Sequence, residues 1–126
     1  MFALETVNQT HAPFSGVLVD AKAAKVVQDH IMKGLLDLIV LQLLNGEPMH
    51  GYQMILRIRK KFGVYYGPST VYPLLIAMQK KGYVTSQWSL ETERPRKTYT
   101  ITIKGQNLLA AGSDTLKTVR MKLGLE

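Results

Sequence analysis

The stretch that decides the fold is GPSTVYPLLIAMQKKGYV, residues 67–84. Its apolar residues recur at helical spacing, which predicts a helix that packs one side into a core. These residues are Val71, Leu74, Leu75 and Met78. Lys80, Lys81 and Gly82 form the cationic last turn and glycine stop that a helix C-terminus favours. Pro73 is unusual inside a helix because it lacks the amide donor, so we expect it to begin the regular helix or to bend its first turn outward.

Two helical patterns precede this stretch. The segment KGLLDLIVLQLLN, from about Lys33 to Asn45, is apolar on more than one face, so the predicted helix must be covered from two sides. His50 begins the next predicted helix, GYQMILRIRKKFG. The apolar stripe of that helix comprises Tyr52, Ile55, Ile58 and Phe62. Asp20 is the predicted N-cap of a helix through AKAAKVVQDHIMKG, which either continues into the Lys33–Asn45 helix or bends at Gly34.

Two strands and a last helix follow. YVTSQW (Tyr83–Trp88) and TYTITI (Thr98–Ile103) alternate with period two and contain many β-branched and aromatic residues, which predicts a β-hairpin. The loop between them is polar, charged and interrupted by Pro95. The last helix is predicted from about Lys104 to Leu123. Its apolar seam, at alternating spacings of three and four, comprises Leu109, Gly112, Leu116, Val119 and Leu123.

The expected fold class is mostly α with a small β-hairpin. Three helices and a two-stranded wing describe a winged helix-turn-helix, in which the third helix enters the DNA major groove and the wing reaches the adjacent backbone. We divide the chain into a loosely ordered arm (1–19), a winged helix-turn-helix DNA-binding domain with its N-terminal helix (20–104), and a C-terminal dimerisation helix (105–126). Helices at both ends are expected to dimerise, because one small domain can hardly cover both faces of the Lys33–Asn45 helix.

Composition narrows the class of protein. A length of 126 residues fits one small domain, and the absence of Cys excludes disulfides and thiolate metal sites. We expect a cytoplasmic protein without a membrane partner, because no secretory signal opens the chain and Asp37 and Gln42 interrupt its most apolar run. The formal charge of +7 lies mainly in the middle of the chain. It favours a polyanionic partner, with a merely solvated basic surface as the alternative.

The motifs resemble those of the PadR family of transcriptional regulators. They run from about Leu35 to Leu109 in the order LIVLQLLNGEPMHGYQM, PSTVYPLLIAMQKKGYV, RPRKTYTIT and KGQNLL. The resemblance implies a winged-helix domain that dimerises through its terminal helices and represses transcription from a palindromic operator, often with release by a small-molecule effector, whose identity is open. A single C-terminal helix resembles the compact branch of the family. Two departures are Ile76 and Ala77, at positions commonly basic in related sequences, and Thr98 before Tyr99, where the usual wing ending has two aromatics.

Predicted DNA contacts lie first on the helices. Ser69 and Thr70 are short donors near a helix N-terminus, where free amides attract phosphate, although they could serve only as caps. Tyr72 on the flank could reach a phosphate or a thymine methyl, or only pack. Tyr52 has the same two interpretations, with its ring in the core and its hydroxyl on a phosphate. Lys80 is either a phosphate contact or a cation that offsets the helix dipole.

The wing and the last helix supply the remaining predicted sites. Arg94, Arg96 and Lys97 cluster at the predicted loop tip, where long cations can follow phosphates or enter the minor groove. The alternative for these three is a solvated loop. The apolar seam of the last helix is the predicted dimer surface, with Gly112 permitting close helix approach, and intrachain packing is its alternative.

Enzymatic activity is not expected. The sequence has no phosphate loop, no nucleophile motif and no cluster of carboxylates or histidines on one element, so no cofactor is predicted. His50 is interpreted as a helix-start residue, because His11 and His30 show no metal-ligand spacing with it. The predicted function is a sequence-specific regulator that binds double-stranded DNA, acting as a homodimeric repressor. The alternative is a winged-helix module whose basic surface binds an acidic protein.

Overall fold

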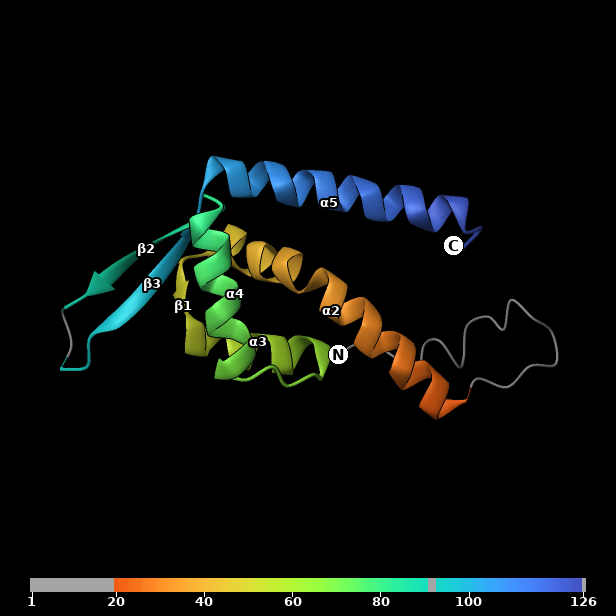
Figure 1. The fold of residues 1–126 in the computed structure, drawn as a ribbon, viewed down its shortest axis with the longest axis horizontal. Helices are drawn as coiled ribbons and strands as arrows, with labels where there is room; N and C mark the ends of the chain where they lie inside the picture. Colours follow the sequence, from red (N-terminus) through yellow and green to blue (C-terminus); the bar gives the residue numbers. More distant parts are fainter. Residues whose placement is uncertain (1–19, 91–92, 126) are drawn as a thin grey trace.

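The computed structural model describes residues 20–90 and 93–125, and Figure 1 shows the path of the chain. The elements in chain order are α2 (Ala21–Gly46), β1 (Met49–His50), α3 (Gly51–Phe62), α4 (Pro68–Lys80), β2 (Val84–Ser89), β3 (Arg96–Ile101) and α5 (Ile103–Lys122). Three helices before a hairpin are the arrangement of a winged helix-turn-helix, so the predicted fold class is confirmed. The predicted arm, residues 1–19, lies outside the described residues.

Helix α2 is one continuous helix of 26 residues (Figure 1). The Asp20 carboxylate accepts a hydrogen bond from the Lys22 amide at 3.0 Å, which confirms the predicted N-cap. Of the two predicted alternatives, the helix continues through Gly34. A single glycine costs a helix about 1 kcal/mol, and the burial of apolar side chains on the adjacent turns offsets that cost. The buried residues of α2 are Met32, Leu36, Ile39, Val40, Leu41 and Leu44.

One apolar core joins α2, α3, α4 and the sheet. Outside α2, its buried side chains are Met49, Met54, Ile55, Ile58, Val71, Leu75, Met78, Val84 and Tyr99. The predicted apolar side of α4 is thereby confirmed, with Leu74 only partly buried. Tyr52 does not belong to the core: it is 58% exposed, so its predicted packing is wrong. The buried face of α3 passes through Gly51, and Tyr52 lies about 100° further round the helix.

The sheet contains an unpredicted third strand. β2 and β3 form the predicted hairpin, whereas β1 pairs Met49 with Tyr99 and His50 with Thr98, which gives the strand order β1-β3-β2. A strand of two residues has no periodicity that a sequence pattern could detect. Its pairing places His50, the residue that begins α3, beside the wing.

The second wing strand begins earlier than predicted. β3 spans Arg96–Ile101 rather than residues 98–103. It begins earlier because Arg96 and Lys97 pair with Ser89 and Trp88, and it ends earlier because Thr102 is already the N-cap of α5. Arg96 and Lys97 therefore lie in the strand, and the prediction that they belong to the loop tip is wrong. In the hairpin register Lys97 lies opposite Trp88.

Helix α5 packs against α2 near the sheet, and in Figure 1 the two helices separate toward the C-terminus of α5. A Cβ on Gly112 would lie 2.5 Å from the Leu38 side chain, so this glycine permits close packing within one chain. Leu109 is partly buried against the core. For these two residues of the predicted seam, intrachain packing is present. Leu116, Val119 and Leu123 are exposed in the single chain.

Candidate nucleic-acid interface

Helix α4 begins at Pro68 with Gly67 as its N-cap, and no side chain caps it. The interpretation of Ser69 and Thr70 as caps is therefore wrong, and both lie exposed in the first turn. Pro73 lies in the second turn, so the prediction that it begins the regular helix is also wrong. Its missing amide would have bonded the Ser69 carbonyl, and because both residues are exposed, water can take that place.

The C-terminus of α4 has the predicted glycine stop. Gly82 adopts a left-handed φ of 83°, and its amide donates to the Gln79 carbonyl at 3.0 Å. The Tyr83 amide donates to the Met78 carbonyl, also at 3.0 Å. This pair of bonds is a Schellman motif, which turns the chain from α4 directly into the wing.

The outer face of α4 is both polar and apolar. Tyr72, Ile76 and Lys80 are spaced four residues apart, so they share one side of the helix. All three are exposed, and Ile76 is exposed over 51% of its surface in the middle of that side. Such a face offers a hydroxyl, a methyl surface and an ammonium group, which match phosphates and the thymine methyl of a DNA major groove.

Gly51 determines where the Tyr72 ring lies. A Cβ at position 51 would overlap that ring, so only a residue without a side chain lets Tyr72 pack on the first turn of α3. Tyr72 thus packs through part of its ring and remains exposed elsewhere, and its contact with DNA stays a prediction.

A cavity of about 480 Å³ lies between the wing and helices α3 and α4, and we call it the wing groove. Its lining residues are His50, Gly51, Tyr52, Tyr72, Trp88, Arg94, Pro95, Arg96, Lys97 and Tyr99. The lining combines aromatic rings with cations. Burial, and secondly the nearby Tyr72, raise the pKa of the Tyr99 hydroxyl, so it stays a neutral hydrogen-bonding group.

The cations of the wing groove are held by neighbouring groups. The Lys97 ammonium lies 5.8 Å from the centroid of the Tyr99 ring and 6.0 Å from that of Trp88, within the range of cation–π attraction. Arg96 places Nη1 2.9 Å from Nε2 of His50. These contacts bring two of the predicted wing cations together beside Tyr52 and Tyr72.

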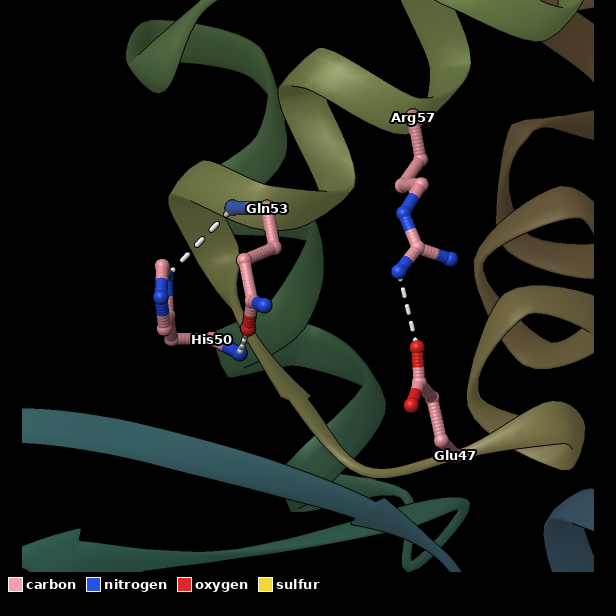
Figure 2. A network of polar contacts seen from close by, with 4 residues as sticks. All are labelled: Glu47, His50, Gln53 and Arg57. Atoms are coloured by element: carbon pink, nitrogen blue, oxygen red, sulfur yellow. Dashed lines mark hydrogen bonds and ion pairs between the residues drawn. The ribbon is translucent and has the colours of Figure 1, made fainter.

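His50 lines the wing groove and also begins α3, and the close-up in Figure 2 shows its contacts with Gln53 of that helix. Its Nδ1 lies 3.4 Å from the Gln53 amide, and the Gln53 side-chain oxygen accepts from the His50 amide at 3.0 Å, which forms a capping box. Beside this pair, Arg57 and Glu47 form an ion pair of 2.8 Å (Figure 2). The interpretation of His50 as a helix-start residue is confirmed.

The structure brings together five of the predicted DNA-binding residues. Tyr52, Tyr72, Arg94, Arg96 and Lys97 line the wing groove, whereas Ser69, Thr70 and Lys80 lie on the exposed surface of α4 outside it. Sequence reasoning did not place His50, Gly51 or Trp88 at this site. The signal was present in the letters HGY (residues 50–52) of the motif LIVLQLLNGEPMHGYQM, but its meaning depends on β1 and on packing between helices.

A second cavity, of about 390 Å³, lies between α2, the end of α3 and α5, and we call it the apolar groove. Its lining residues are Leu35, Leu38, Ile39, Gln42, Leu43, Lys61, Phe62, Leu109, Ser113, Leu116, Lys117 and Arg120. Apolar side chains form most of its surface, and cations lie among them. This groove leaves the second face of α2 partly uncovered in the single chain.

Comparison with known proteins assigns the family. The sequence profile of the transcriptional regulator PadR-like family matches residues 40–111. The chain belongs to this family. PadR-like proteins are transcriptional regulators and not enzymes, which confirms the expectation that the chain is no enzyme. No protein with a curated description matches the chain in sequence.

Solved structures agree with the PadR-like assignment. A transcriptional regulator from Clostridium thermocellum has 25% identity and a TM-score of 0.69, over 75% of this chain and 95% of its own. A PadR-like transcriptional regulator from Bacillus cereus has 25% identity and a TM-score of 0.68, over 75% and 93%. Bacillus subtilis PadR, solved in complex with operator DNA, has 25% identity and a TM-score of 0.57, over 61% of this chain and 45% of its own.

Two further observations concern the described part of this PadR-like chain. No helix in residues 20–90 and 93–125 is long and apolar enough to cross a membrane. Within the same residues, no group of three or more His, Cys, Asp or Glu side chains is placed to hold a metal ion.

The capping histidine predicts how the stability of this PadR-like protein varies with pH. Burial, and secondly the Arg96 charge, lower the pKa of His50 below its usual value of 6.5. The unfolded chain therefore binds a proton at a higher pH than the folded chain does, and stability falls as the pH drops from about 6.5 through the folded pKa. In chemical denaturation between pH 5 and 8, the stability of the parent relative to His50→Asn is expected to decrease toward acid. A pH-independent difference would contradict this prediction.

Proposed function

We propose that this PadR-like regulator is a homodimeric repressor that recognises a palindromic operator through α4 and the wing. The observation that carries the proposal is the wing groove. It places the cations Arg94, Arg96 and Lys97 next to Tyr52 and Tyr72, beside the exposed face of the helix that a winged helix-turn-helix inserts into DNA.

The proposed docking assigns separate roles to the two surfaces. The outer face of α4 enters the major groove, where Tyr72 and Ile76 can contact base edges and thymine methyl groups. Ser69 and Thr70, in the first turn, lie where helix amides and short hydroxyls favour a phosphate, and Lys80 can meet the backbone at the other end. The wing cations contact the phosphates beside the DNA major groove. These contacts fix the register of α4 on the duplex and do not distinguish one base sequence from another.

The proposed homodimer rests on apolar surface that one chain leaves open. Val26, Val27 and Ile31 are exposed on the N-terminal half of α2, and Leu116 and Val119 are exposed on α5. We assign these residues and the apolar groove to the surface of the terminal helices that a second copy covers. A two-fold dimer would place two α4 helices about one turn of DNA apart, which suits a palindrome.

Repression is the sign of regulation that we propose. A dimer bound across an operator excludes other proteins from the same DNA, and this needs no contact with a further partner. A small-molecule effector, whose identity is open, could enter the apolar groove and change the spacing of the two α4 helices, because α2 and α5 line both that groove and the proposed dimer surface.

The test is binding to a duplex selected from a random library. Tyr72→Ala and Arg96→Ala are each expected to weaken operator binding by about 10- to 100-fold, the usual effect of losing a base or positioning contact. Arg96→Ala should also lower the salt slope by about one. Fluorescence anisotropy at several salt concentrations measures both effects. The unfolding midpoint of Arg96→Ala should match that of the parent, whereas Tyr72→Ala loses the packing of its ring on α3 and should unfold at a lower denaturant concentration while remaining folded without denaturant.

Lys22→Ala is the matched control, because Lys22 is an exposed cation in the first turn of α2, outside the wing groove. It should bind the operator as the parent does. If Tyr72→Ala and Arg96→Ala both bind the operator as tightly as the parent does, the site assignment is wrong. If the library yields no enriched duplex, the alternative function, a basic winged-helix module for an acidic protein, is favoured.

A further inference from the structure

His50 lies between two hydrogen-bond donors that come from different elements. On one side is the backbone amide of Gln53 in α3, 3.4 Å from Nδ1. On the other side is the guanidinium of Arg96 in β3, whose Nη1 lies 2.9 Å from Nε2. A neutral imidazole has one N–H and only one nitrogen that accepts, so it can accept from one of these donors at a time.

The two distances indicate from which donor the imidazole accepts a hydrogen bond. At 2.9 Å the contact with Arg96 has the length of a well-formed hydrogen bond, whereas 3.4 Å to the Gln53 amide is long. The helix start keeps another bond in either case, because the Gln53 side chain accepts from the His50 amide at 3.0 Å (Figure 2). The favoured tautomer therefore carries its proton on Nδ1 and accepts at Nε2.

This bond constrains the cation that borders the wing groove. Arg96 is exposed, and an exposed arginine loses much rotamer freedom when it binds a phosphate. A guanidinium has five N–H donors, so one bond to Nε2 leaves four for another acceptor. The antiparallel pairing of β1 with β3 fixes the His50 backbone opposite Thr98, and from there the imidazole reaches the Arg96 guanidinium.

We propose that His50 is a positioning residue for DNA binding, which accepts a hydrogen bond from Arg96 and holds its guanidinium ready for a phosphate. The proposal rests on the proposed function, because it assigns the supporting contact of that same site. Its competitor is a purely structural role, in which His50 only caps α3.

Asparagine at position 50 separates the two roles. Asparagine is among the strongest N-cap residues, so His50→Asn supplies a side-chain acceptor for the first turn of α3. Its side chain ends near the position of Nδ1 and cannot reach Arg96, because Nε2 lies on the far side of the ring. We expect His50→Asn to unfold at a midpoint no lower than that of the parent. We expect it to weaken operator binding by about 3- to 10-fold, because the Arg96 side chain regains rotamer freedom that it must lose again on binding.

The double variant shows whether His50 acts through Arg96. In the Arg96→Ala background, His50→Asn should change operator affinity by less than about 2-fold, since the contact is already absent. An equal loss in both backgrounds would overturn the proposal, because His50 would then act on the DNA directly. Parental affinity of the single variant would overturn it as well.

A measurement without DNA separates failure of this proposal from failure of the proposed function. Nitrogen NMR distinguishes a protonated from an unprotonated ring nitrogen. At neutral pH Nε2 of His50 should be unprotonated in the parent and should gain the proton in Arg96→Ala, where Nδ1 can return to capping. If Nε2 carries the proton in the parent, the positioning role is wrong, whatever the DNA results. If the NMR result holds but no duplex binds, the proposed function is wrong and His50 positions Arg96 for a different anionic partner.

Discussion

Glutamate in place of Leu116 is expected to convert the proposed dimer into a folded monomer and to weaken binding to a full palindrome at least about 100-fold. Leu116 is 44% exposed in the single chain and lines the apolar groove, so a carboxylate there can reach water while the chain is alone. A second copy would bury that charge among apolar side chains, which is strongly unfavourable. A dimer that binds two linked half-sites has an affinity about 100- to 10,000-fold higher than that for one half-site, and the monomer loses this increase in affinity.

Sedimentation at micromolar concentration gives the oligomeric state, and anisotropy with full and half operators gives the affinities. Met121→Glu is the matched control, because Met121 is 77% exposed on the same helix and lies about 140° round it from Leu116. The control should remain a dimer with parental affinity. A Leu116→Glu protein that sediments as a dimer would show that the seam on α5 is not the interface.

The elements with strong local patterns could be predicted from the sequence. Helix α4 carries its apolar period, its C-terminal cation and its glycine stop within one short stretch, and the two wing strands alternate with period two. Each signal lies within a few residues of the structure it specifies. The order of these elements is therefore sufficient to predict the winged helix-turn-helix.

The geometry of the candidate site depends on contacts between distant residues, which no local pattern records. Tyr52 follows the period of its helix but lies outside the core, because Gly51 occupies the buried position against the Tyr72 ring. The contact between His50 and Arg96 joins residues 46 positions apart. It exists because β1, too short to have a period, pairs with β3.

The predicted seam on α5 shows how one pattern can serve two surfaces. Gly112 is predicted to permit close helix approach, and it does so toward Leu38 of the same chain. Leu116 and Val119 continue the same period, yet they are exposed, since α2 and α5 separate toward the C-terminus of α5 (Figure 1). The spacing of residues predicts which of them share a side of a helix. The angle between α2 and α5 decides where along α5 the intrachain contact ends.

Alanine in place of Gly105 is expected to lower the free energy of unfolding by about 3 kcal/mol, near the upper end of overpacking effects. Gly105 is buried in the first turn of α5, and a Cβ there would overlap the Tyr83 carbonyl oxygen and lie 2.9 Å from the Ile101 side chain. The oxygen cannot move aside easily, because it accepts from the Thr102 amide at 3.1 Å. The Thr102 hydroxyl also donates to the Gly82 carbonyl at 2.6 Å, which joins α5 to the end of α4.

Urea denaturation measures the loss of unfolding free energy in Gly105→Ala, with Gly34→Ala as the control. Position 34 lies inside α2, and a Cβ added there would have nothing within 4 Å, so alanine should stabilise the chain by about 0.5–1 kcal/mol through helix propensity alone. Gly105 has no positive φ, so conformational strain cannot explain a loss at that position. If Gly105→Ala is as stable as the parent, the first turn of α5 is free to shift, and α5 is not rigidly seated on the wing. If it is destabilised as expected, the first turn of α5 is closely packed against Tyr83 and Ile101, which supports a fixed orientation of α5 in the proposed dimer.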